Sequence, residues 1–192
     1  MSSNVLEALK NLRSNLHNVG SLNNWGKTVL NQGAVAKEKM DNFTLVTLEF
    51  NATSGEREAT PLANNTTKGY LVASPEEYMR EYESISSFFN GKGERVRIVT
   101  LEPGVRFECS NVDFDQKTNN DPASGHPLKN GQHAHYDYAS KKFMISNHAS
   151  ASPSGSGANM NTGYRDAVNK VVLVDKDCTS IDGQTVYRFE VI

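Results

Sequence analysis

Two histidines separated by one residue have the spacing in this chain best suited to chemistry. His133 and His135 stand in the run at residues 131–137, and His148 follows further along the chain. Side chains two residues apart in a β-strand point to the same side, so both imidazoles can reach one metal ion, with His148 as a third ligand. A lone His-x-His pair is common by chance, and surface or loop histidines explain it more simply. We therefore expect no metal and no cofactor.

The pair resembles the first half of the cupin metal motif, in which a glycine precedes His-x-His. The carboxylate that completes that motif is absent, because Ser140, Lys141 and Lys142 stand where it should lie and Asp137 has the wrong spacing. The sequence also lacks a glycine-rich phosphate loop and a Gly-x-Ser-x-Gly nucleophile elbow. A cupin-like metal-binding enzyme is thus only an alternative, and we expect that the protein is not an enzyme.

Composition argues against several other classes. The 192 residues carry a net charge of -2, whereas nucleic-acid-binding domains usually carry a basic excess, so no specific nucleic acid is expected as a partner. No apolar run approaches the roughly 18 residues of a membrane span, and the start of the chain lacks a signal-peptide pattern. We expect a protein made in a cytoplasm, with no membrane partner. Cys109 and Cys178 lie in strand-like runs and are expected as buried, reduced thiols.

Most of the chain is patterned as short strands separated by turns. Residues 94–101 and 105–110 alternate apolar and polar side chains around Pro103-Gly104, a pair that suits a type II turn, and so predict a tight β-hairpin. Its charged face carries three arginines: Arg95, Arg97 and Arg106. Further strands are predicted over residues 43–50, 68–73, 136–146, 168–174 and 185–192, and a helix over 74–89. About eight to ten strands against two short helices indicate a mainly β fold, a small β-barrel or sandwich.

The first forty residues have a different pattern. Asn4 and Glu7 have the spacing of a capping box, and Leu9, Leu12 and Leu16 follow at helical intervals, which predicts an amphipathic helix that ends before Gly20. This helix either docks on a partner or packs on its own domain. Residues 21–39 hold Trp25 among polar residues, as an extended arm would. We therefore divide the chain into an N-terminal helix and arm, 1–40, and a separable β domain, 41–192.

A more specific pattern runs through the middle third of the chain. It consists of Lys-Gly-Tyr-Leu-Val-Ala-Ser at 68–74, Tyr-Glu at 82–83, Phe-Phe-Asn-Gly-Lys-Gly-Glu-Arg-Val-Arg-Ile-Val at 88–99, and Gly-Val-Arg-Phe-Glu-Cys-Ser at 104–110. In this order, the runs resemble the core of head decoration, or cement, proteins of tailed bacteriophages. They are turns and strand patterns, and they carry no chemistry of their own.

The resemblance implies a structural virion protein, made in the host cytoplasm and bound to the outer surface of the capsid. Its partners would be the major capsid protein, at seams between subunits, and further copies of itself in a homodimer or homotrimer. A phage tail, baseplate or fibre-base component with a similar barrel is the alternative. Aromatic and basic residues are frequent hot spots of interfaces. We expect the contact in the N-terminal segment, at Leu9, Leu12, Leu16 and Trp25, with the arginine face as the next candidate.

Overall fold

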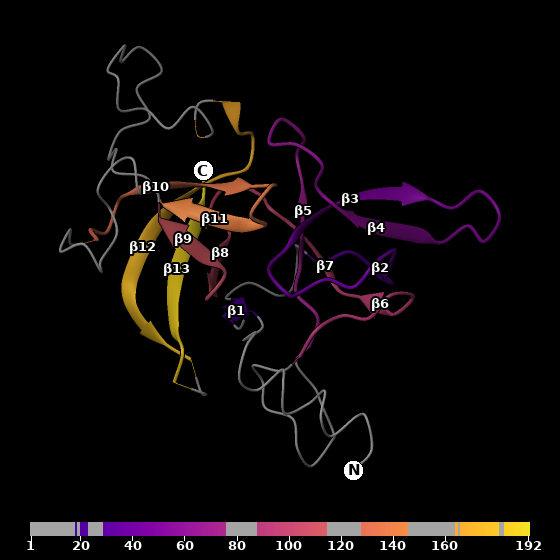
Figure 1. The fold of residues 1–192 in the computed structure, drawn as a ribbon, viewed down its shortest axis with the longest axis horizontal. Helices are drawn as coiled ribbons and strands as arrows, with labels where there is room; N and C mark the ends of the chain where they lie inside the picture. Colours follow the sequence, from indigo (N-terminus) through magenta and orange to yellow (C-terminus); the bar gives the residue numbers. More distant parts are fainter. Residues whose placement is uncertain are drawn as a thin grey trace.

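Figure 1 shows the computed structural model, in which two β-sheets make up the body of the protein. The structure describes residues 18, 20–22, 29–75, 88–114, 128–145, 164, 166–180 and 183–192. In this part of the chain nearly all regular structure is β-strand, so the mainly β fold predicted from the sequence is confirmed. The helix predicted before Gly20 and most of the one predicted after Ser74 lie outside the described residues.

The larger of the two described sheets is mixed. Within the described residues it contains seven strands, in the spatial order β1 (Gly20–Leu22), β8 (Arg106–Cys109), β13 (Thr185–Val191), β12 (Lys170–Thr179), β10 (His133–Asp137), β11 (Lys142–Ile145) and β9 (Val112–Phe114). Among the described strands of this sheet, only β9 and β11 pair in parallel. The strands predicted over 136–146 and at the end of the chain are confirmed as the β10–β11 hairpin and the β12–β13 pair.

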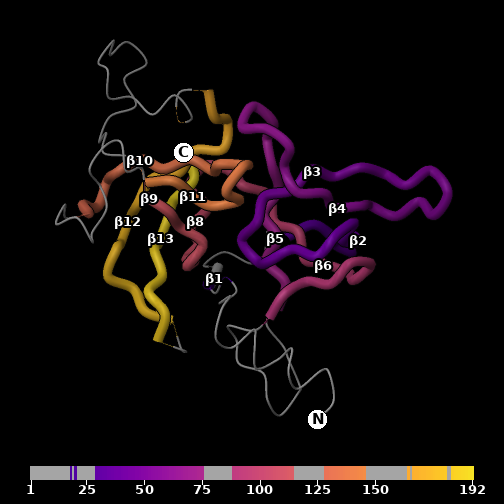
Figure 2. The backbone as a smooth tube through the Cα atoms, viewed as in Figure 1, coloured from indigo at the N-terminus to yellow at the C-terminus, as the bar shows by residue number. Residues whose placement is uncertain are grey.

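The second sheet curls toward a closed barrel. Its described strands lie in the order β6 (Arg95–Val96), β2 (Ala34–Ala36), β4 (Arg57–Pro61), β3 (Leu45–Phe50), β5 (Tyr70–Val72) and β7 (Ile98–Thr100). The two edge strands, β6 and β7, are separated in sequence by Arg97 alone, which brings the sheet's ends together. The β3–β4 hairpin extends beyond this barrel as a long projection (Figures 1 and 2). We call this projection the β3–β4 arm.

Two hydrophobic clusters follow from the alternation of side chains along these strands. Leu45, Leu71 and Val99 point from the second sheet toward the first, where they belong to one core with Phe107 and its aromatic neighbours. The adjacent residues point the other way and fill the barrel with small side chains, among them Ala34, Ala36, Val46, Ala59, Val72, Val96 and Ile98. Because alternate residues serve different cores, the second sheet is buried on both faces.

The predicted central hairpin is wrong in its pairing, although its turn is present. Gly104 has a φ of 87°, and the Val105 N–H donates to the Glu102 carbonyl at 3.0 Å, as a type II turn requires. However, β7 pairs with β5 in the barrel, whereas β8 pairs with β1 and β13 in the other sheet. The turn therefore carries the chain from one sheet to the other. An alternating pattern determines which side chains share a face, not which strand becomes the neighbour.

Residues 29–40, which were assigned to the N-terminal segment, contribute to the barrel. β2 is placed between β4 and β6, and Ala34 and Ala36 are buried. Met40 is buried as well, and its backbone exchanges hydrogen bonds with that of Asn90 at 3.0 and 2.9 Å. Residues 29–40 are therefore not an appendage of the second sheet, because the narrow barrel interior needs their small side chains to fill it. The division of the chain at residue 40 stays a prediction, but β2 belongs to the second sheet.

Candidate interaction surface

The predicted histidine pair lies on β10 beneath a tyrosine ring. The ring of Tyr164 contacts both imidazoles edge-on, with centroid distances of 5.8 Å to His133 and 5.9 Å to His135, so the two histidines do share one side of the strand. The Tyr164 hydroxyl lies 2.9 Å from Nδ1 of His133, and the Lys170 ammonium lies 4.8 Å from the centre of the Tyr164 ring. Through these contacts the pair fastens the segment that precedes β12 to the sheet.

A metal site would need more donors than this pair offers. Across the residues that the structure describes, no group of three His, Cys, Asp or Glu side chains could hold a metal ion. His148, the third ligand considered from the sequence, lies outside the described residues. Asp137 ends the same strand, but its carboxylate accepts hydrogen bonds from Ser140 and Asn65. Burial opposes its ionisation, yet these hydrogen bonds hold the pKa of Asp137 below its usual value.

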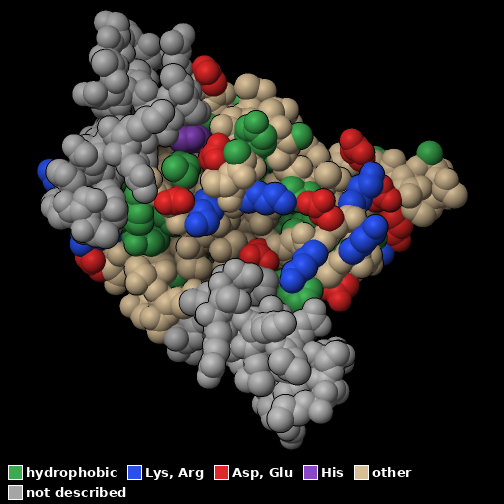
Figure 3. All heavy atoms as spheres, in the orientation of Figure 1, with side chains coloured by type: hydrophobic (Ala, Val, Ile, Leu, Met, Phe, Trp, Pro, Cys, Tyr) green, Lys and Arg blue, Asp and Glu red, His purple; other side chains and the backbone are tan. Residues whose placement is uncertain are grey.

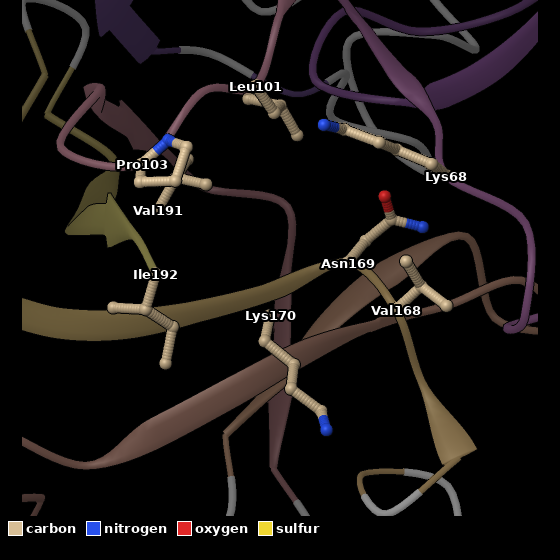
Figure 4. Close-up of a pocket in the computed structure, with 8 residues that line it drawn as sticks. All are labelled: Lys68, Leu101, Pro103, Val168, Asn169, Lys170, Val191 and Ile192. Carbon is tan, nitrogen blue, oxygen red and sulfur yellow. The ribbon is translucent and has the colours of Figure 1, made fainter.

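A cleft with mostly apolar walls opens where the two sheets meet (Figure 4). It has a volume of about 130 Å³ and is lined by Lys68, Leu101, Pro103, Val168, Asn169, Lys170, Val191 and Ile192. Asn169 holds two of its walls together, because its side chain accepts from the Gly69 N–H at 2.8 Å and donates to the Thr67 carbonyl at 2.7 Å. Both the oxygen and the nitrogen of the amide are thus engaged within the protein, at one edge of the cleft.

Exposed hydrophobic side chains gather around this cleft. Among the described residues four large hydrophobic side chains are exposed, and two of them, Val168 at 48% and Ile192 at 51%, line the cleft. A third, Tyr138 at 41%, is linked to Val168 through Asn65, which accepts hydrogen bonds from the N–H groups of both residues at 2.8 and 2.9 Å. We call Tyr138, Val168 and Ile192 the cleft patch. The fourth, Phe50, stands apart on the β3–β4 arm.

The two lysines of the cleft differ from most other basic side chains of the described surface. Basic and acidic groups are interspersed on the face seen in Figure 3, and many of them are paired, as in Lys37–Glu58 at 3.0 Å and Lys141–Glu38 at 3.4 Å. Within the described residues, neither Lys68 nor Lys170 forms an ion pair with a carboxylate. Lys68 reaches across the cleft toward Leu101, and Lys170 lies along its opposite edge (Figure 4).

The arginines that were expected to share one face are divided between the two sheets. Arg95 of β6 donates to both carboxylate oxygens of Glu56 at 2.9 Å. Arg106 of β8 donates to Glu190 at 2.6 Å. Arg97, between β6 and β7, is half-buried. The predicted common face does not form, because its two strands belong to different sheets.

The other predicted contact residues, Leu9, Leu12, Leu16 and Trp25, lie outside the described residues. Sequence reasoning also missed the cleft patch, whose members lie far apart in the chain. One signal was available: Tyr138 is a large aromatic residue in an otherwise small and polar turn that joins β10 to β11. Over the described residues, no helix has the length and apolar character needed to span a membrane.

Comparison with known proteins shows that this two-sheet protein is of phage origin. The family model described as YonC prophage protein matches residues 13–192, and the chain belongs to this family. The chain is also 37% identical, over 181 residues, to the SPbeta prophage-derived uncharacterized protein YonC of Bacillus subtilis (strain 168). That match covers 92% of this chain and 91% of the relative. No solved structure matches. The phage origin implied by the sequence resemblance is confirmed.

Proposed function

We propose that this protein is a structural component of the phage virion. In this proposal it binds the outer surface of the head, at seams between major capsid protein subunits, and stabilises the shell. Its membership of a prophage family and its two-sheet β body support this function. Attachment to a repeated lattice does not need a deep pocket, because many modest contacts act together through a high effective concentration.

The observation that carries the proposal is the β3–β4 arm, which projects from the barrel (Figure 2). Contacts with neighbouring segments hold it in place: Arg95 pairs with Glu56, Lys37 pairs with Glu58, and the Arg57 guanidinium donates to the Asn31 carbonyl at 2.9 Å. Exposed ion pairs are individually weak, but several of them restrict how the arm can move. A projection that is already ordered can reach an adjacent subunit with little further loss of conformational entropy.

The N-terminal segment is the second part of the proposed contact. The sequence predicts an amphipathic helix with Leu9, Leu12 and Leu16, followed by Trp25, and these are aliphatic and aromatic side chains of the kind that dominate interface energies. The same segment is the candidate for pairing between copies in a homodimer or homotrimer. Arg95 and Arg106 are engaged in ion pairs within the chain, so we give them a supporting role.

The direct test is to add purified protein to phage heads that lack it. The number of bound copies and the resistance of the heads to heat are measured, and cryo-EM locates the protein. We expect stoichiometric binding at subunit seams, weakened by Trp25→Ala or by deletion of residues 1–17. Density on the tail, baseplate or fibre base would replace head binding with the tail alternative, and an absence of particle binding would overturn the proposal.

The cupin-like alternative has a separate test. Metal is measured in protein purified without a histidine tag, before and after the double change His133→Ala and His135→Ala. We expect less than stoichiometric metal in both samples. Stoichiometric metal that is lost in the double variant would favour the enzyme alternative over a purely structural role.

A further inference from the structure

The cleft patch is a local concentration of apolar surface. Single exposed hydrophobic side chains are normal on soluble proteins, but contiguous exposed groups mark sites of interaction. Of the four large hydrophobic side chains that are exposed in the described part of the chain, Val168 and Ile192 line one cleft, and the backbone of Tyr138 shares the hydrogen-bond partner Asn65 with that of Val168. Phe50, the fourth, lies apart from the others on the β3–β4 arm and is not part of this patch.

The cleft gives this surface a shape that can receive a side chain. Its volume of about 130 Å³ is close to that of engineered apolar cavities, about 150 Å³, that bind benzene. Leu101 and Val191 form buried walls, while Val168 and Ile192 stand exposed at its rim (Figure 4). One aliphatic or aromatic side chain of a partner can therefore enter, with the exposed residues around it completing a dry contact.

The charges at the cleft indicate what should flank that side chain. Lys68 and Lys170 lie at the cleft without a carboxylate partner among the described residues, while the ammonium of Lys170 also faces the Tyr164 ring. Oppositely charged groups across an interface speed association and determine its register. A partner with carboxylates next to its apolar side chain supplies the missing counter-charges.

We infer that the cleft patch docks a segment of a partner protein in which one apolar side chain is flanked by carboxylates. This inference rests on the proposed function, and the partner it names is the major capsid protein. It adds a second contact beside the one proposed for the N-terminal segment. In this second contact the apolar side chain of the capsid protein enters between Leu101 and Val191, and its carboxylates pair with Lys68 and Lys170. The cleft lies where the two sheets meet, so the body itself takes part in attachment.

The test compares the full-length protein with variants of the cleft in binding to heads that lack it. Val168→Asp places a negative charge in the rim, and Lys68→Glu reverses the charge at the mouth. Each is expected to weaken binding roughly tenfold or more, the range of an interface hot spot. Val168→Ile keeps the rim apolar, and Lys92→Glu reverses an exposed lysine elsewhere, so both controls should bind like the wild type. Melting curves confirm that the variants fold.

A photo-crosslinking residue gives an independent readout of the partner. Benzoylphenylalanine at position 138 should crosslink to the major capsid protein, whereas the same residue at position 92 should not. Crosslinks at position 138 that join two copies of this chain would overturn the inference and make the patch a self-interface.

The outcomes separate this inference from the proposed function. If the wild type, Val168→Asp and Lys68→Glu bind heads equally, the docking site is refuted while head binding stands. If the wild type binds tails and not heads, and Val168→Asp abolishes that binding, the patch is a docking site but its partner is not the major capsid protein. If the wild type binds no particle, both proposals are overturned.

Discussion

Asn42 is a buried polar residue whose removal should cost considerable stability. It is 1% exposed, and its side chain makes three hydrogen bonds to segments distant in sequence. The amide donates to the Ser74 carbonyl at 2.9 Å, and its oxygen accepts from the Ser74 N–H at 3.0 Å and from the Asn90 amide at 3.1 Å. Asn42 thus joins the region before β3 to Ser74 and Asn90, which are 32 and 48 residues away in the chain.

We expect Asn42→Ala to lower the free energy of unfolding by roughly 3 kcal/mol, at about 1 kcal/mol for each hydrogen bond lost. The cost can be higher, because Ser74 and Asn90 are left with polar groups that have lost their partner. Total stabilities are about 5–15 kcal/mol, so the variant should remain folded at low temperature and melt early. Urea unfolding followed by circular dichroism measures the difference as a shift of the midpoint at constant slope.

Asn64→Ala is the matched control. The Asn64 side chain also accepts three hydrogen bonds, but it is exposed, and all three come from Thr66 and Thr67 nearby in sequence. Water can replace these bonds, so we expect a loss of less than about 1 kcal/mol. Equal effects of the two substitutions would refute the argument that burial and sequence separation, and not bond number, determine the contribution of Asn42.

Three further outcomes are expected. Deleting residues 1–17 should leave cooperative melting intact, whereas deleting 1–40 should abolish soluble expression, because it removes β2 from the barrel. Gly104→Val should lower the melting temperature, since a φ of 87° costs a branched residue about 1 kcal/mol or more; an unchanged curve would contradict the turn. Burial raises the pKa of both thiols. A thiol reagent should therefore label the half-buried Cys178 slowly at neutral pH and faster as the pH rises, and should label Cys109 only after unfolding. Rapid labelling of Cys109 in the folded protein would contradict its burial.

Local patterns in the sequence were sufficient to predict features that depend on neighbouring residues, such as turns and the buried face of a strand. The Pro103-Gly104 pair predicted a turn that the structure contains, because Pro sets φ for one position and Gly tolerates the positive φ of the next. Alternation predicted that Phe107 and Cys109 are buried, and both are. The candidate sites were less accessible to such reasoning, since the cleft patch combines residues 138, 168 and 192, which no local pattern connects.

Phe43 shows how the surrounding structure overrides a local pattern. The sequence predicts a strand at this position, yet Phe43 has a φ of 61°, a left-handed conformation that is unfavourable for a bulky residue. Its N–H donates to the Val72 carbonyl at 2.7 Å, its carbonyl accepts from Asn111 at 3.0 Å, and its ring stacks on Phe107. These long-range contacts offset the backbone strain.

The sequence alone determined the strand-rich class, the turn positions and the faces that enter a core, because each depends on residues within a few positions of one another. Tertiary structure alone decided that β7 and β8 join different sheets and that the short Ala-Val-Ala strand β2 completes the barrel. Alanine has little intrinsic preference for strands, and a period of two leaves the neighbour of each strand open. Which strands pair is determined by how the whole set of apolar faces can be buried at once, and that depends on residues far apart in the chain.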